Sequence, residues 1–234
     1  MRHQDQTPLP EPLLEWHSTA AGEVPVSVAF GDPYFSLAGG LAETAHVFHR
    51  GNGLPERFRP GFQIAELGFG TGLNLLASWA LWEASGQGGS LRYTSFEAFP
   101  MSVAQTAQAL AAFPQLAPRI GRFLAALDRQ EPGFALGPVQ VEIIAGDARQ
   151  TLPHWKGRAD AWFLDGFSPA RNPELWSAAL LAEVGRHTVA QGSFATYTAA
   201  GHVRRGLQEA GFAVDRSPGF GHKRHMSAGR LAAG

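Results

Sequence analysis

The chain has 234 residues, of which 44% are hydrophobic and 17% charged, as in one large globular domain or one domain with a small addition. It contains no Cys, which excludes disulfides, a catalytic thiol and Cys-based zinc or iron–sulfur sites. The formal net charge of -1 hides an asymmetry, because residues 201–234 hold six Lys and Arg against two Asp and Glu. Such a basic end indicates either contact with a polyanion such as RNA or a solvated surface.

The N-terminal residues lack the apolar segment of a secretory signal, and no apolar run reaches the ~18 residues of a membrane span. We therefore expect a soluble, cytoplasmic protein without membrane contact.

LLEWHS is compatible with a short strand. VPVSVAF, which begins at Val24, alternates like a half-buried strand, and PYFS is a second extended piece after the turn at residues 31–33. The two pieces predict a β-hairpin.

A helix is expected next, because Leu41, Ala45 and Phe48 fall on one helical face and Gly51 is a plausible C-cap. We accordingly predict that residues 1–58 form a small hairpin and helix addition. Residues 59–234 would form the main domain.

The most informative stretch is FQIAELGFGTGLN, residues 62–74. A short buried strand is followed by Gly68, Gly70 and Gly72, and then by leucines at helical spacing. A strand, glycine turn and helix are typical of a nucleotide-cofactor loop, because glycine lets a ligand approach the backbone and the helix start offers free N–H groups. The same pattern also occurs in tight turns that bind nothing.

Two details favour S-adenosylmethionine over a dinucleotide such as NAD. Glu66 precedes the first glycine, and a carboxylate there disfavours a pyrophosphate but suits a sulfonium or an ammonium group. Leu73 and Asn74 stand where the dinucleotide pattern has its third glycine. An NAD-dependent oxidoreductase stays as the less favoured alternative.

Carboxylates follow three further predicted strands. LRYTSFE ends at Glu97, where a carboxylate can accept hydrogen bonds from ribose hydroxyls, and VQVEIIAG precedes Asp147, an acceptor for an adenine amino group or simply a helix N-cap. ADAWFL is apolar throughout and ends at Asp165, the strongest candidate for chemistry. Any of the three could instead be a surface or capping residue.

SPARNPELW contains two prolines, which predict a fixed loop over residues 167–172 and a helix opened by Pro173.

Helices are expected over residues 102–113 and 115–129, followed by a Pro/Gly turn. GSFATYT predicts a fifth strand, the helix from Gly201 places Val203 and Leu207 inward, and residues 213–219 and 224–231 suit a closing antiparallel pair. This alternation predicts an α/β fold, a Rossmann-like, mostly parallel, doubly wound sheet. His222 and His225 lack an acidic or Cys partner, so we expect no metal site.

Five segments together resemble the methyltransferase domain of the MnmC family, in its stand-alone MnmD-like form: ELGFGTGLN, SFEAFP, AWFLDGFSPARNPELW, FATYTAAGHVRRGLQEAGF and GFGHKRHM. The resemblance runs from about Leu14 to Arg230. It implies a Rossmann-like methyltransferase fold and S-adenosylmethionine-dependent N-methylation of the 5-aminomethyl group of the tRNA wobble (2-thio)uridine. The FAD-dependent oxidase domain of the bifunctional relatives has no counterpart before the end at Gly234, so no FAD is expected. The preference for 2-thio or 2-oxo uridine and the source of the free amine stay open.

The resemblance also implies roles for individual residues. The methionine end of the cofactor would be framed by Glu66, Gly68, Gly70 and Asn74, its ribose by Glu97 and its adenine by Asp147. Asp165 would orient the substrate amine and help its proton leave.

The substrate side is expected to contact the tRNA anticodon loop. Candidates for the wall that holds the splayed-out uridine are Tyr34, Phe35 and Phe167, with Asp32 as a further substrate contact. Candidates for phosphate contacts are Arg204, Arg205, Lys223 and Arg224. Two other functions stay open: methylation of a different amine acceptor and non-catalytic RNA binding.

Overall fold

The computed structural model describes residues 11–19, 22–37, 39–131 and 133–232. Its central sheet is formed by β3 (Gln63–Leu67), β4 (Leu91–Glu97), β5 (Gly133–Leu136), β6 (Val139–Ala145), β7 (Ala159–Leu164), β8 (Thr188–Thr196), β9 (Phe212–Pro218) and β10 (His225–Leu231). The eight strands lie in the order β5-β6-β4-β3-β7-β8-β10-β9. The middle five run parallel, while β5, β10 and β9 pair antiparallel with their neighbours. The predicted mostly parallel sheet and closing antiparallel pair are confirmed.

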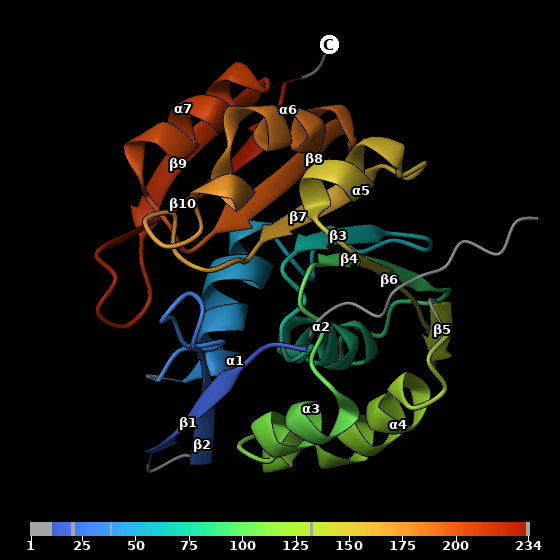
Figure 1. Cartoon of the computed structure of the whole chain (residues 1–234). Helices are drawn as coiled ribbons and strands as arrows, with labels where there is room; N and C mark the ends of the chain where they lie inside the picture. Colours follow the sequence, from blue (N-terminus) through green and yellow to red (C-terminus); the bar gives the residue numbers. More distant parts are fainter. Residues whose placement is uncertain (1–10, 20–21, 38, 132, 233–234) are drawn as a thin grey trace, which may run out of the picture.

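Helices cover both faces of this sheet (Figure 1). One face carries α2 (Leu73–Ala84), α3 (Val103–Leu110) and α4 (Ala117–Leu127), and the other carries α5 (Ala148–Thr151), α6 (Ala178–Arg186) and α7 (Gly201–Glu209). Because side chains alternate along a strand, neighbours in β3 enter different cores: Ile64 packs in one buried cluster and Ala65 in the other. The doubly wound arrangement is therefore confirmed, and Pro173 opens the short helix η4 (Pro173–Trp176) as predicted.

The N-terminal hairpin exists, but its pairing differs from the prediction. β1 (Leu14–Thr19) and β2 (Gly22–Ser27) pair antiparallel over six residues, whereas the expected partner PYFS contributes only the isolated bridge between Val26 and Pro33. LLEWHS thus supplies the partner strand. The residues after Pro33 leave the hairpin, and Tyr34 and Phe35 turn into the main cavity instead.

The predicted N-terminal helix is also present, with an unexpected geometry. It begins as α1 (Gly40–Glu43), continues as the π-helix η1 (Thr44–Arg50) and ends at Gly51. The wider π turn rotates the buried face, so Val47 and Phe48 are buried while Ala45 is exposed.

Residues on both sides of position 58 share one core. Phe48, Leu54 and Phe58 belong to the same buried cluster as Ile64, and Asn52 donates a hydrogen bond to the carbonyl of Trp162 in β7 at 3.2 Å. The division at residue 58 stays a prediction, with the first part packed against the second.

One edge strand was not predicted. The expected Pro/Gly turn contains β5, which buries Phe134 and Leu136 and pairs with β6. Four residues are too few to give a periodic signal.

None of the helices within the described ranges has the length and hydropathy of a membrane span.

Candidate active site

The candidate site lies where the strand order reverses. β3 pairs with β4 on one side and with β7 on the other, and a crevice forms at the carboxyl ends of strands at such a point. A cavity of about 830 Å³ opens there, lined by the loops after β3, β4, β6 and β7, by residues between 30 and 48 and by the β9–β10 loop. Its volume falls in the range of about 300–1,000 Å³ that is usual for small-molecule sites.

The glycine loop forms the floor of this cavity. Gly68, Gly70 and Gly72 all have positive φ (86°, 54° and 76°), a conformation that side chains disfavour. A Cβ on Gly68 would come within 2.0 Å of the carbonyl oxygen of Asp165. The loop and the end of β7 therefore pack backbone against backbone, which brings Asp165 to the start of α2.

Asn74, in the first turn of α2, connects two carboxylates. Its Nδ2 donates to Glu66 Oε1 at 2.9 Å and to Asp165 Oδ2 at 2.7 Å, while its Oδ1 accepts from Thr44 Oγ1 at 2.7 Å. Ser95 Oγ donates to the second oxygen of Glu66 at 2.7 Å. An ionised carboxylate can only accept, so the acids fix the amide orientation that turns both N–H groups toward them, and the Thr44 hydroxyl donates to the amide oxygen.

Both acids have raised pKa values. Burial raises the pKa of Glu66 to about 8; the charge of Asp165 adds to the rise, and the hydrogen bonds from Asn74 and Ser95 oppose it. Burial, followed by the charge of Glu43, raises the pKa of Asp165 to about 7, against the hydrogen bond from Asn74 and the charge of Lys223. Asp165 can therefore take up and release a proton near neutral pH.

The carboxylates that follow β4 and β6 are anchored differently. Glu97 accepts hydrogen bonds from the backbone N–H groups of Gly70 at 2.9 Å and Phe99 at 2.8 Å, which fix it at the cavity edge. Asp147 is the N-cap of α5, one of the two roles predicted for it, and accepts from the backbone of Arg149 at 2.9 Å. The Arg149 side chain also donates to it and lowers its pKa.

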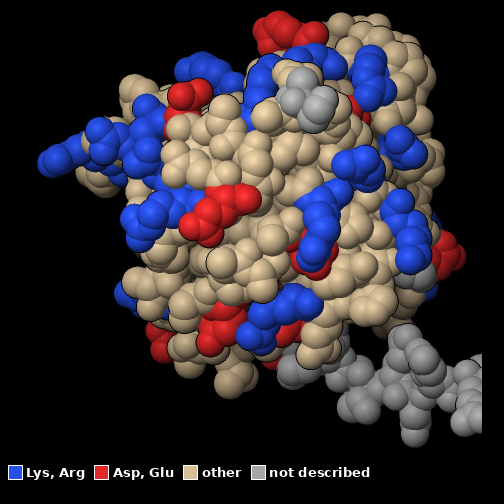
Figure 2. Space-filling model, turned by 90° about the horizontal axis from the view of Figure 1, so that it is seen from above, with Lys and Arg blue, Asp and Glu red and all other residues tan. Residues whose placement is uncertain are grey.

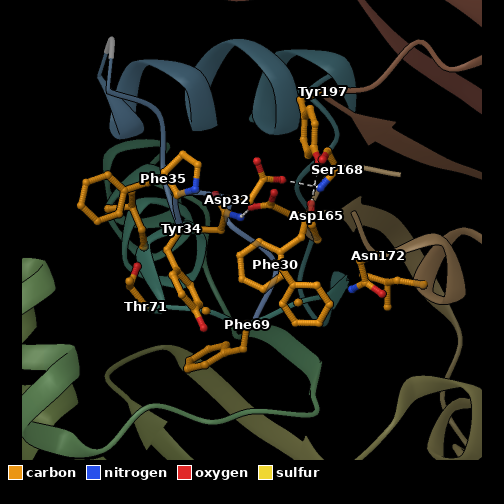
Figure 3. Close-up of a pocket in the computed structure, with 18 of the residues that line it drawn as sticks. Phe30, Asp32, Tyr34, Phe35, Phe69, Thr71, Asp165, Ser168, Asn172 and Tyr197 are labelled. Atoms are coloured by element: carbon orange, nitrogen blue, oxygen red, sulfur yellow. Dashed lines mark hydrogen bonds between the residues drawn. The ribbon is translucent and has the colours of Figure 1, made fainter. Parts of the chain in front are cut away.

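Aromatic rings form one wall (Figure 3). Phe30 stacks on Phe167 with centroids 4.6 Å apart, and Tyr34 meets Phe167 edge-on at 5.0 Å. Phe35 also lines the cavity but packs edge-on against the buried Phe113. A flat apolar group such as a nucleobase fits against a wall of this kind.

The loop over residues 167–172 is tied to the N-terminal part of the chain. Asp32 Oδ2 accepts from the backbone N–H of Ser168 at 2.7 Å, and Arg171 donates to the carbonyls of Phe30 at 3.0 Å and Gly31 at 2.6 Å. Asp32, which stays a predicted substrate contact, lines the cavity, and it also holds the wall in place.

Of the four basic residues expected to contact phosphates, Lys223 lines the cavity. Its Nζ donates to Glu43 Oε1 at 2.8 Å and lies 3.9 Å from the ring centroid of Tyr197. The other three are outside the cavity lining: Arg204 and Arg205 on α7 and Arg224 in the β9–β10 loop. Figure 2 shows the face of the molecule that carries α6 and α7. The Lys and Arg side chains on this face form several groups that are separated from one another.

The structure brings the predicted cofactor residues together. Gly68, Gly70, Asn74, Glu97 and Asp147 line the cavity with Asp165, whereas Glu66 is fully buried beneath it. Sequence reasoning missed Phe30, Glu43, Thr44 and Tyr197. Tyr197 could have been found by the strand-end rule, since it follows β8 directly. Glu43 had no such signal because it reaches the site from α1.

A nucleoside cofactor with a cationic end fits these residues. Carboxylates lie at the ends of successive strands. The glycine loop has positions where an added Cβ would contact neighbouring residues. Within the described part of the chain, no group of three His, Cys, Asp or Glu is arranged to hold a metal ion.

Comparisons with known proteins agree with this geometry. Residues 118–232 match the family described as S-adenosyl-L-methionine-dependent methyltransferase. The chain is 48% identical over 219 residues to the tRNA 5-methylaminomethyl-2-thiouridine biosynthesis bifunctional protein MnmC of Chromobacterium violaceum, covering 89% of this chain and 33% of that protein. It is 46% identical over 227 residues to the MnmC protein of Pseudomonas aeruginosa, covering 92% of this chain and 34% of that protein.

Among solved structures, MnmC2 from Aquifex aeolicus superposes with a TM-score of 0.76 at 28% identity, covering 96% of this chain and 72% of that one. Spermidine synthase from Thermotoga maritima, at 11% identity, covers 95% of this chain and 73% of that one with a TM-score of 0.53, and shares the fold. The chain spans about a third of the length of the curated relatives it matches. The chain is an S-adenosyl-L-methionine-dependent methyltransferase that is similar, along nearly its whole length, to the methyltransferase part of the MnmC proteins.

Proposed function

We propose that this methyltransferase transfers a methyl group to the 5-aminomethyl nitrogen of the tRNA wobble (2-thio)uridine, giving 5-methylaminomethyl-(2-thio)uridine. The observation that carries the proposal is Asp165. It follows β7 directly and lines the cavity together with Phe30 and Phe167, and its pKa is about 7. The MnmC relatives, which are named for the biosynthesis of 5-methylaminomethyl-2-thiouridine in tRNA, support the same substrate.

The cofactor would lie on the glycine floor. Gly68, Gly70 and Asn74 would face its methionine end, Glu97 its ribose and Asp147 its adenine, whereas Glu66 would act through the hydrogen bond to Asn74. When bound, S-adenosylmethionine supplies an electrophilic methyl group whose transfer breaks the methyl–sulfur bond.

The chain's own residues prepare the amine. A primary aminomethyl group is mostly protonated in neutral water and has no free lone pair in that form. Asp165 accepts a proton from the ammonium group, which frees the nitrogen lone pair to form the new carbon–nitrogen bond. Asn74 holds Asp165 Oδ2, so the other oxygen faces the amine. Positioning of this kind supplies much of the rate in a displacement reaction.

The uridine would leave the anticodon stack and lie against Phe167 and Tyr34, with Phe35 as a further ring of the cavity lining and Asp32 holding the loop that carries Phe167. Lys223, Arg204, Arg205 and Arg224 would meet phosphates of the anticodon stem and loop. A tRNA substrate implies action in the cytoplasm. The free amine would come from a separate reaction, and FAD is not expected to take part in this one.

The decisive experiment incubates the protein with labelled S-adenosylmethionine and two tRNAs, one with 5-aminomethyluridine and one with 5-carboxymethylaminomethyluridine at the wobble position. Label on the first tRNA alone supports the proposal. Label on neither, with cofactor binding intact, would show that this methyltransferase uses another acceptor.

A further inference from the structure

One cation already occupies the substrate side of the cavity. The ammonium group of Lys223 donates to Glu43 at 2.8 Å and lies over the face of Tyr197, 3.9 Å from the ring centroid. Such a carboxylate and aromatic face together are a usual arrangement for binding an organic ammonium ion. We define Glu43 and Tyr197 as the ammonium subsite.

The subsite is built from separate parts of the chain. Glu43 ends α1, with its side chain 13% exposed, and Tyr197 follows β8. The hydroxyl of Tyr197 donates to the carbonyl of Gly166 at 2.7 Å, which fixes the ring beside the residue that follows Asp165. An aromatic face held in this way gains affinity for a cation because its orientation is already fixed.

The subsite adjoins the proposed base. The charges of Glu43 and Lys223 shift the pKa of Asp165 in opposite directions, and burial, followed by the charge of Asp165, raises the pKa of Tyr197. All four residues line the same cavity. A cation held by Glu43 and Tyr197 is therefore within electrostatic reach of Asp165.

The occupant can leave without moving the backbone. Lys223 lies in the β9–β10 loop, and its side chain is 43% exposed. A lysine ammonium sits on a flexible four-carbon stem, so rotation about these bonds can carry it into solvent. Its terminal CH₂–NH₃⁺ group is the same chemical group that a protonated 5-aminomethyluridine carries.

We propose that Glu43 and Tyr197 bind the protonated aminomethyl group of the substrate and present it to Asp165, and that Lys223 is an internal surrogate which the substrate displaces. The inference rests on the proposed function, because it takes a primary amine as the methyl acceptor. In the free protein, the ammonium group of Lys223 therefore occupies the subsite that the substrate amine takes in the complex. The displaced ammonium group becomes available to a tRNA phosphate.

The test uses ligands without phosphates, so that phosphate contacts contribute nothing. Binding of 5-aminomethyluridine and of its neutral isostere 5-hydroxymethyluridine is measured by calorimetry on protein loaded with S-adenosylhomocysteine. We expect the wild-type protein to prefer the amine. In the Lys223→Met background, where no internal ammonium group competes for Glu43, Glu43→Gln should reduce that preference about tenfold by removing one charge-assisted hydrogen bond, and should leave binding of the hydroxymethyl compound unchanged.

Lys223→Met gives the sharper result, because it removes the competitor and keeps the length of the stem. We expect it to tighten binding of 5-aminomethyluridine several-fold. If Lys223 only contacts phosphate, the substitution should not change the affinity for a nucleoside. The matched control is Glu83→Gln, which removes a carboxylate paired with Arg119 at 2.5 Å on α2, outside the cavity lining, and should change neither affinity.

Unchanged amine preference when Glu43→Gln is added to Lys223→Met, unchanged or weaker amine binding in Lys223→Met alone, or equal binding of both nucleosides to the wild type would each overturn the ammonium subsite. Methylation of aminomethyl-tRNA by the wild type, measured in parallel, tests the proposed function separately. Methylation without a Glu43 effect leaves the function and removes the subsite. A Glu43-dependent amine preference without tRNA methylation supports the subsite and indicates another amine acceptor.

Discussion

Asn74 Nδ2 lies 2.7 Å from Asp165 Oδ2, and this hydrogen bond joins the cofactor loop to the end of β7. The same amide group reaches Glu66 and Thr44, so the nitrogen and the oxygen of the Asn74 side chain both have partners. The amide acts as a fixed spacer between two acids. It keeps Asp165 pointing in one direction.

Removal of this spacer should slow the reaction more than it weakens cofactor binding. We expect Asn74→Ala to lower kcat by about 10- to 100-fold, because a buried hydrogen bond to a charged group contributes about 1.5–3 kcal/mol. The measurement is steady-state kinetics together with cofactor binding by calorimetry. Ser78→Ala is the control, since it removes a buried hydrogen bond to His49 one turn further along α2. Equal losses in both variants would mean that Asn74 only stabilises the helix.

Asp165→Asn tests the proposed proton acceptor. The amide has the shape of the carboxylate, and its oxygen can still accept from Asn74, so we expect the fold to persist. Turnover should fall about 10²- to 10⁴-fold, the usual contribution of a general base, while the dissociation constant of the cofactor changes little. Single-turnover methylation measured beside cofactor binding decides the matter. Near-normal turnover would remove Asp165 from the mechanism.

The pH profile should move in opposite directions in two variants. Activity needs ionised Asp165, so the wild-type rate should rise with pH through about 7. Lys223 favours the ionised form and Glu43 opposes it. Lys223→Met should therefore shift the rising limb to higher pH, and Glu43→Gln should shift it to lower pH. Profiles of kcat/KM against pH, which report the free enzyme before the substrate displaces Lys223, measure both shifts, and identical limbs would contradict this electrostatic arrangement.

Gly68 should tolerate no side chain. Gly68→Ala would place a Cβ within 2.0 Å of the carbonyl oxygen of Asp165, on a backbone whose φ is 86°. The control is Gly61→Ala, where φ is 76° and nothing lies within 4 Å of the added carbon. We expect the control to lose about 1–2 kcal/mol from left-handed strain alone. Thermal unfolding should show a larger loss for Gly68→Ala, accompanied by loss of cofactor binding, and equal losses would show that the clash relaxes freely.

Binding of tRNA should depend on salt if the arginines of α7 and the β9–β10 loop meet phosphates. We expect Arg204→Ala, Arg205→Ala and Arg224→Ala each to reduce the slope of log K against log salt by about one, because each variant neutralises one phosphate fewer. Arg92→Ala is the control, because Arg92 lies near the start of β4, at the opposite end of the sheet from the cavity. Binding that is flat from low to moderate salt would remove this role from all three residues.

The strand ends explain how much of the site the sequence could predict. Glu97 ends a strand, and Asp147 and Asp165 come just after one. Each of these strands is recognisable from its own residues, and the ends of parallel strands lie at one edge of the sheet. Glu43 and Thr44 reach the same cavity from the junction of α1 with the π-helix η1, whose register no helical period reproduces. The hairpin partner was misassigned because LLEWHS and PYFS both flank VPVSVAF, and the choice between them depends on tertiary contacts. Local patterns therefore predicted the sheet side of the site, and the side built by long-range packing was visible only in the structure.

The contacts of Asp32 with Ser168 and of Arg171 with the carbonyls of Phe30 and Gly31 have a consequence for redesign. They join a loop near the start of the chain to one that follows β7, so the aromatic wall behaves as a single part made from two distant segments of sequence. A chimera that imports only the loop over residues 167–172 from a relative would leave Asp32 and its neighbours facing a foreign partner. Transfer of acceptor preference between members of this family should therefore require both loops to be exchanged together.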